Sequence, residues 1–167
     1  MSDSLTTTTT PIPRSEEEIL NAYKEASSTM FGFGAEDYLV ALPFASAKPY
    51  LTNDVTEQDW NRFATRTRES VIAKMKEYAN FAWSKVIAHR GISAGRNLDH
   101  YRAWCWLLGD EESVNFLNAE DGYAPYGAPK LAFVCKKYNL FIPNTEEARR
   151  MSEGESCENG CTEGCNS

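Results

Sequence analysis

The stretch RESVIAKMKEYANFAWSKVIAHR, from Arg68 to Arg90, decides the fold class. Its apolar side chains recur at steps of three and four residues, the spacing that gives a helix one continuous core-facing stripe. The stripe consists of Val71, Ile72, Met75, Tyr78, Ala79, Ala82, Trp83 and Val86. Gly91 follows, and glycine commonly ends a helix in the left-handed conformation. A long, core-facing helix is therefore expected over about residues 68–90.

The sequence that follows predicts a second buried helix. Ser93 suits the capping position before its first turn, because a serine hydroxyl accepts a hydrogen bond from a free backbone amide there. The apolar face of this helix consists of Leu98, Tyr101, Trp104, Cys105 and Leu108. Trp106 and Leu107 lie off that face, so the last turns are apolar on nearly all sides. A helix of this kind is usually buried.

Shorter helices are expected on both sides of this pair. Ser15 and Glu18 have the spacing of a capping box, and Asn144 suits the cap of a last, polar helix near residues 146–150. No segment alternates polar and apolar residues as a half-buried strand does. The expected fold is all-α, a compact array of about six to eight helices around one long central helix, about 68–90, with flexible N- and C-terminal tails.

The two ends of the chain differ from the middle in composition. Residues 1–14 are rich in threonine and proline, and residues 152–167 in cysteine, glutamate and glycine. Neither end has enough apolar side chains to form a core, so both are expected to be disordered. The expected organisation is an arm over residues 1–14, a single helical domain over 15–151 and a tail over 152–167.

Hydropathy and charge set the expected location and partners. No apolar run reaches the roughly 18 residues of a membrane span, and residues 1–10 lack the basic and apolar parts of a secretory signal. We therefore expect a soluble, cytoplasmic protein that does not enter a membrane. Net charge is −7, yet residues 62–102 hold nine Lys/Arg against three Asp/Glu. Such a basic stretch either steers an anionic partner or is neutralised by acidic residues within the fold.

The segment from His89 to His100 contains the most suggestive chemistry. Free amides at a helix N-terminus attract anions, and glycines let a phosphate or carboxylate approach the backbone. Arg96 and His100 are four residues apart and share a helix face. The candidate anion-binding residues are His89, Arg90, Ser93, Gly95, Arg96 and His100. The alternative is that the glycines and Ser93 are only helix caps.

Two further segments suggest binding. The loop over residues 121–129 has two tyrosines, Tyr123 and Tyr126, whose rings offer contact area to a partner at low entropic cost. Packing of this loop onto its own domain is the equal alternative. The tail has thiols at even spacing, Cys157, Cys161 and Cys165, among glutamates. Thiolates bind Zn or Cu(I), although a fourth ligand is missing; redox chemistry and an unstructured tail are the alternatives.

Catalytic patterns are not found in the sequence. It lacks the Gly-x-Ser-x-Gly elbow and any His-x3-His or His-Glu-x2-His metal pattern. The first hypothesis is thus a non-catalytic binding or regulatory protein that presents a helical surface with the basic stretch, residues 62–102, to a macromolecular partner, which we expect to be a protein. The alternatives are an enzyme or ligand-binding domain for a small anionic compound, and metal or redox handling by the cysteine tail. Nucleic acid is a weaker partner, because the whole protein is acidic.

Overall fold

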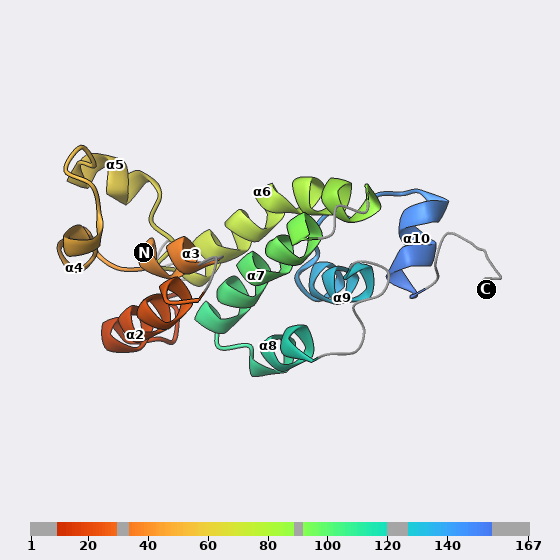
Figure 1. Cartoon of the computed structure of the whole chain (residues 1–167), viewed down its shortest axis with the longest axis horizontal. Helices are drawn as coiled ribbons and strands as arrows, with labels where there is room; N and C mark the ends of the chain where they lie inside the picture. Colours follow the sequence, from red (N-terminus) through yellow and green to blue (C-terminus); the bar gives the residue numbers. More distant parts are fainter. Residues whose placement is uncertain (1–9, 30–33, 89–91, 120–126, 155–167) are drawn as a thin grey trace, which may run out of the picture. The chain divides into compact units, whose positions relative to one another are not determined.

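The computed structural model describes residues 10–29, 34–88, 92–119 and 127–154, with backbone alone at residues 92–94. The expected all-α fold is confirmed (Figure 1). The described residues contain nine α-helices and one 3-10 turn, with an isolated bridge between Pro11 and Thr67 as their one β-type pairing. In chain order these are α2 (Glu16–Ser27), α3 (Ala35–Leu39), α4 (Phe44–Ala47), η1 (Lys48–Tyr50), α5 (Glu57–Arg62), α6 (Arg68–Ile87), α7 (Ile92–Leu107), α8 (Glu111–Asn118), α9 (Ala128–Tyr138) and α10 (Glu146–Ser152).

The helix starts follow local hydrogen bonding. Ser15 and Glu18 form the expected capping box, in which the Ser15 hydroxyl accepts from the Glu18 amide at 3.1 Å and the Glu18 carboxylate accepts from the Ser15 amide at 2.8 Å. The expectation that Asn144 caps the last helix is wrong. Thr145 caps α10, because its hydroxyl accepts from the Ala148 amide at 3.1 Å. Gly91 lies outside the described residues.

The chain divides into two compact units. Unit 1 consists of Met1–Lys74 and Ala103–Glu111, and unit 2 of Met75–Arg102 and Glu112–Ser167. Helices α6 and α7 each contribute residues to both units. The single domain over residues 15–151 stays a prediction.

Unit 1 buries apolar side chains from α2, α3, α5 and the last turns of α7. Its core includes Ile19, Leu39, Leu42, Trp60, Trp104, Cys105 and Leu107. The Trp60 indole donates to the Leu42 carbonyl at 2.8 Å, and the Arg66 guanidinium donates to the same oxygen at 3.1 Å. These bonds satisfy polar groups that burial would otherwise leave without partners.

An N-terminal strap (Thr10–Arg14) belongs to unit 1 and contacts the first turn of α6 and the end of α7, so the described part of the expected flexible arm, residues 1–14, is ordered by contacts. The Thr10 carbonyl accepts from the Arg68 amide at 2.6 Å, and the Glu69 carboxylate accepts from the Thr10 amide at 2.8 Å. This second bond lowers the pKa of Glu69 below its ordinary value. The Arg68 amide belongs to the first turn of α6, which leaves free donors. The Thr10 carbonyl of the strap accepts from one of these donors, a contact that helical spacing in the sequence does not predict.

Arg14 holds the other end of the strap. Its guanidinium lies 4.1 Å from the centre of the Trp106 ring, and its Nε donates to the Trp106 carbonyl at 2.8 Å. The Trp106 ring also meets the Tyr38 ring edge-on at 5.5 Å. Cation–π stacking with a hydrogen bond from the same group fixes Arg14 more firmly than either contact alone.

Gly109 gives a stability test of the strap. Its φ is +76°, and a Cβ there would lie 2.9 Å from Cγ of Pro13. Gly109→Ala is expected to lower the free energy of unfolding by about 1–2 kcal/mol, the cost of a left-handed non-glycine residue. Gly95→Ala is the matched control, because a Cβ at Gly95 meets nothing within 4 Å. That change is expected to stabilise α7 by about 0.5–1 kcal/mol. Urea unfolding of both variants tests this prediction, which equal effects would contradict.

Unit 2 buries the expected stripe of the long helix. Met75, Ala79, Ala82, Trp83 and Val86 are at most 1% exposed, which confirms the predicted phase over this part of α6. The core also includes Leu98 and Tyr101 of α7, Leu117 of α8, Leu131, Val134 and Cys135 of α9, and Met151 of α10. The Tyr101 hydroxyl donates to the Met75 carbonyl at 2.9 Å and joins α7 to α6.

Lys130 is a fully buried cation in unit 2. Its side chain is 0% exposed, and its ammonium donates to the carbonyls of Phe116 at 2.7 Å, Leu117 at 3.3 Å and Ala119. These carbonyls lie at the C-terminal end of α8, which attracts positive charge because its carbonyls lack helical partners. Lys130 thereby ties the start of α9 to the end of α8.

Candidate functional site

The predicted anion site is only partly described. His89 and Arg90 lie outside the described residues, as does the side chain of Ser93. Ser93 is the second residue of α7, inside the helix, so the expectation that it caps this helix is wrong. Gly95 and Arg96 follow in the next turn, with Arg96 exposed. Anion binding at His89, Arg90, Ser93, Gly95, Arg96 and His100 stays a prediction.

His100 lies against a neighbouring helix. Its ring meets the Tyr78 ring edge-on at 5.2 Å, and its side chain is half-buried. The sequence places His100 opposite the apolar face of α7, where a solvated side chain is expected. The structure instead packs it beside α6. The reason is that the flank of α7, rather than its apolar face alone, contacts the flank of α6.

Asn97 fixes the position of the Tyr78 ring through the hydroxyl at its end. The Tyr78 hydroxyl donates to Oδ1 of Asn97 at 2.6 Å, and Asn97 is 2% exposed. Its Nδ2 is buried with no acceptor among the residues that the structure describes. A buried hydrogen bond between two helices holds both side chains in one arrangement.

The Phe81 patch, defined as Tyr78, Phe81, Lys85 and His100, lies beside this hydrogen bond. Phe81 is 48% exposed, with its ring 5.3 Å from that of Tyr78. The Lys85 ammonium lies 4.9 Å from the Phe81 ring centre, within the distance of a cation–π contact. The patch therefore combines an exposed aromatic ring with a cation on one rigid helix.

The sequence contained one signal for this patch. Tyr78, Phe81 and Lys85 are three and four residues apart, so they share a row on α6. Phe81 falls outside the apolar stripe of that helix, and a large ring outside the core-facing stripe is a candidate for surface contact. The contacts of Tyr78 with His100 and Asn97 of α7 depend on how α6 and α7 pack together, which spacing within one helix does not give.

The cations of the basic stretch, residues 62–102, differ in whether they form ion pairs. Arg62 pairs with Asp59 at 2.8 Å and Arg102 with Asp99 at 2.9 Å. Half-burial raises the pKa of Asp99, and Arg102 partly offsets this effect. Lys76 and Lys85, by contrast, make no ion pair within the described ranges. One part of the stretch is thus neutralised within the fold, and another part leaves cations at the surface.

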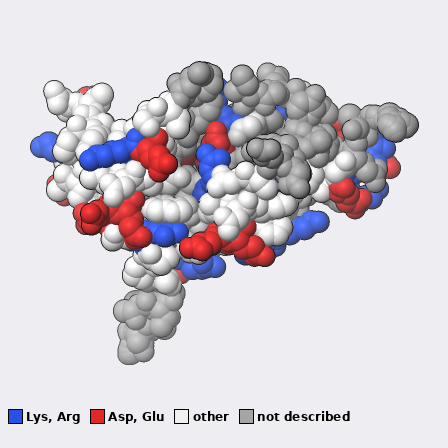
Figure 2. All heavy atoms as spheres, turned by 60° about the horizontal axis from the view of Figure 1, so that its bottom comes forward, with Lys and Arg blue, Asp and Glu red and all other residues white. Residues whose placement is uncertain are grey.

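Charge on the molecular surface is locally mixed. On the face drawn in Figure 2, carboxylates and cations lie in small neighbouring groups with uncharged areas between them. This face does not present a field of one sign of the kind that steers a polyanion over a distance.

The other predicted sites fall mostly outside the described residues. Tyr123 and Tyr126, and the three tail thiols Cys157, Cys161 and Cys165, are among the residues not described. Zn or Cu(I) binding by the tail stays a prediction, and the described part of the chain contains no group of three or more His, Cys, Asp or Glu that would hold a metal.

Two cysteines within the described residues are buried free thiols. Cys105 and Cys135 are both 0% exposed. Burial raises the pKa of Cys135 to about 12. The thiolate is the reactive form of cysteine, so Cys135 is unreactive at neutral pH.

The comparisons with known proteins find no relative. No protein family model matches the chain, and no match was found among curated proteins or solved structures. None of the described helices combines the length and the apolar character that crossing a membrane requires.

Proposed function

We propose that this protein is a non-catalytic binding protein whose Phe81 patch takes an acidic segment of a partner protein. The observation that carries the proposal is the exposed ring of Phe81 beside the Lys85 ammonium. Aromatic side chains are enriched where proteins bind one another. The ring supplies apolar contact area, and the cation selects a carboxylate.

The rigidity of the patch supports this function. Phe81 and Lys85 lie on the 20-residue helix α6, and Tyr78 is held by Asn97 and His100. A preorganised surface loses little conformational entropy when it binds, which leaves more of the contact energy for affinity. A cytoplasmic location is part of the proposal, since buried free thiols such as Cys105 and Cys135 suit a reducing compartment.

The test uses a fluorescent peptide that alternates glutamate with leucine and phenylalanine, measured by anisotropy. The Phe81→Ala, Lys85→Ala double variant is expected to bind at least about tenfold more weakly than the wild type, because loss of a contact hot spot costs more than about 1.4 kcal/mol. Phe141→Ala, Lys76→Ala is the matched control. Phe141 is also 48% exposed, and Lys76 is likewise an unpaired surface cation.

Two outcomes would contradict the proposal. One is equal peptide affinity of the double variant and the control variant, which would mean that the patch is not the binding surface. The other is tighter binding of a single-stranded oligonucleotide than of the peptide, lost in the double variant alone. That result would assign the patch to base stacking on an aromatic ring.

A further inference from the structure

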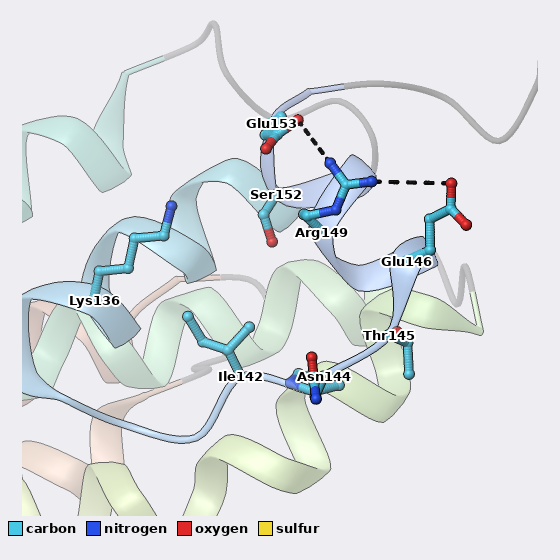
Figure 3. A pocket seen from close by; sticks show the side chains of 9 residues that line it. Lys136, Ile142, Asn144, Thr145, Glu146, Arg149, Ser152 and Glu153 are labelled. Atoms are coloured by element: carbon cyan, nitrogen blue, oxygen red, sulfur yellow. Dashed lines mark ion pairs between the residues drawn. The ribbon is translucent and has the colours of Figure 1, made fainter.

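An open pocket of about 800 Å³ lies in unit 2 between the end of α9, the connector that follows it, and α10 (Figure 3). Lys136 lines it from α9, and Arg149 lines it from α10. Ile142, Pro143 and Asn144 belong to the connector. The volume lies within the range of pockets that hold small molecules. It shares no residue with the Phe81 patch.

Arg149 lines the pocket, with its guanidinium turned toward Glu146 and Glu153 and away from Lys136 (Figure 3). Its guanidinium lies 3.9 Å from the Glu146 carboxylate and 3.8 Å from that of Glu153. Both distances exceed those of hydrogen bonds, and all three side chains are more than half exposed. Exposed ion pairs of this kind contribute little. A ligand that hydrogen-bonds to Arg149 therefore displaces only weak contacts.

The other lining residues narrow the class of ligand. Lys136 is exposed and has no partner among the described residues, and it adds a second cation. Ile142 and Pro143 are half-buried and offer apolar surface. Glu146 and Glu153 line the same pocket and repel anions, and this repulsion grows with the charge of the ligand. This combination favours a compound with one anionic group attached to an apolar body.

We propose that this pocket binds a small monocarboxylate, with its carboxylate held by Arg149 and Lys136 and its apolar part on Ile142 and Pro143. A carboxylate matches the planar fork of a guanidinium and accepts two parallel hydrogen bonds from it. The pocket offers both the charge and the apolar surface that such a molecule needs.

The test is an NMR titration of the full chain with sodium benzoate at constant ionic strength, followed through the backbone amides. Saturable shifts are expected at Ile142, Asn144 and Arg149, with a dissociation constant on the order of 1 mM, typical of so small a ligand. Benzamide, the neutral isostere, is expected to bind at least about tenfold more weakly, because Arg149 and Lys136 interact less strongly with an uncharged group.

The matched variants separate the pocket from general charge effects. Lys136→Gln, Arg149→Gln is expected to weaken benzoate binding at least about tenfold. Lys24→Gln, Lys76→Gln removes the same charge at exposed positions outside the pocket and is expected to keep the wild-type affinity. Equal affinity of the two variants, equal binding of benzamide, or shifts that never saturate would each overturn the proposal.

Discussion

Replacing Trp104 by alanine is expected to lower the free energy of unfolding by about 3–5 kcal/mol, the usual cost of emptying a buried aromatic site. Trp104 is 3% exposed and lies on the apolar face of α7, where the sequence predicts it. Cys105 and Leu107, which follow it on α7, are also fully buried, and a close-packed core of this kind fills a new cavity only in part. Urea unfolding measures the loss.

Trp106→Ala is the control for this prediction, because it removes the same side chain from the same helix. Trp106 is only half-buried and packs on Arg14 and Tyr38 near the surface. Its removal is expected to cost less than half as much, since less apolar area returns to water. A Trp104 variant as stable as the Trp106 variant would contradict the placement of Trp104 in the core.

Replacing Lys130 by methionine is expected to cost about 1–3 kcal/mol, the second largest effect among these predictions. Methionine keeps much of the apolar stem but donates no hydrogen bond, so the carbonyls of Phe116, Leu117 and Ala119 lose a shared donor. Removal of a buried charge also saves its desolvation cost, which limits the loss. Thermal and urea unfolding measure the difference.

Lys136→Met on the same helix is the control, because Lys136 is exposed. A surface change of this kind is expected to stay within about 0.5 kcal/mol of the wild type. If Lys130→Met is as stable as this control, then the carbonyls at the end of α8 find other donors and Lys130 does not tie the two helices together.

The candidate site was only partly predictable, for a physical reason that Phe81 and His100 illustrate. Helical spacing places Phe81 off the stripe of α6, and it places Arg96 and His100 on one face of α7. Spacing within one helix does not give the contact between His100 and Tyr78, which joins residues of two helices. The pocket at Lys136 and Arg149 has no sequence pattern at all, because the path of the connector between α9 and α10 creates it.

The sequence by itself determined the longer helices and the apolar stripe that the long helix α6 buries. Helix hydrogen bonds and caps join residues three or four apart, as Ser15 and Glu18 do, so local spacing predicts them, although it placed the caps at Ser93 and Asn144 wrongly. The tertiary structure alone decided the strap and the buried cation. Arg14 and Trp106 are 92 positions apart, and Lys130 reaches carbonyls 11 to 14 positions before it. Contacts at such separations depend on how the helices pack against one another. A periodic pattern in the sequence predicts only which face of each helix is buried.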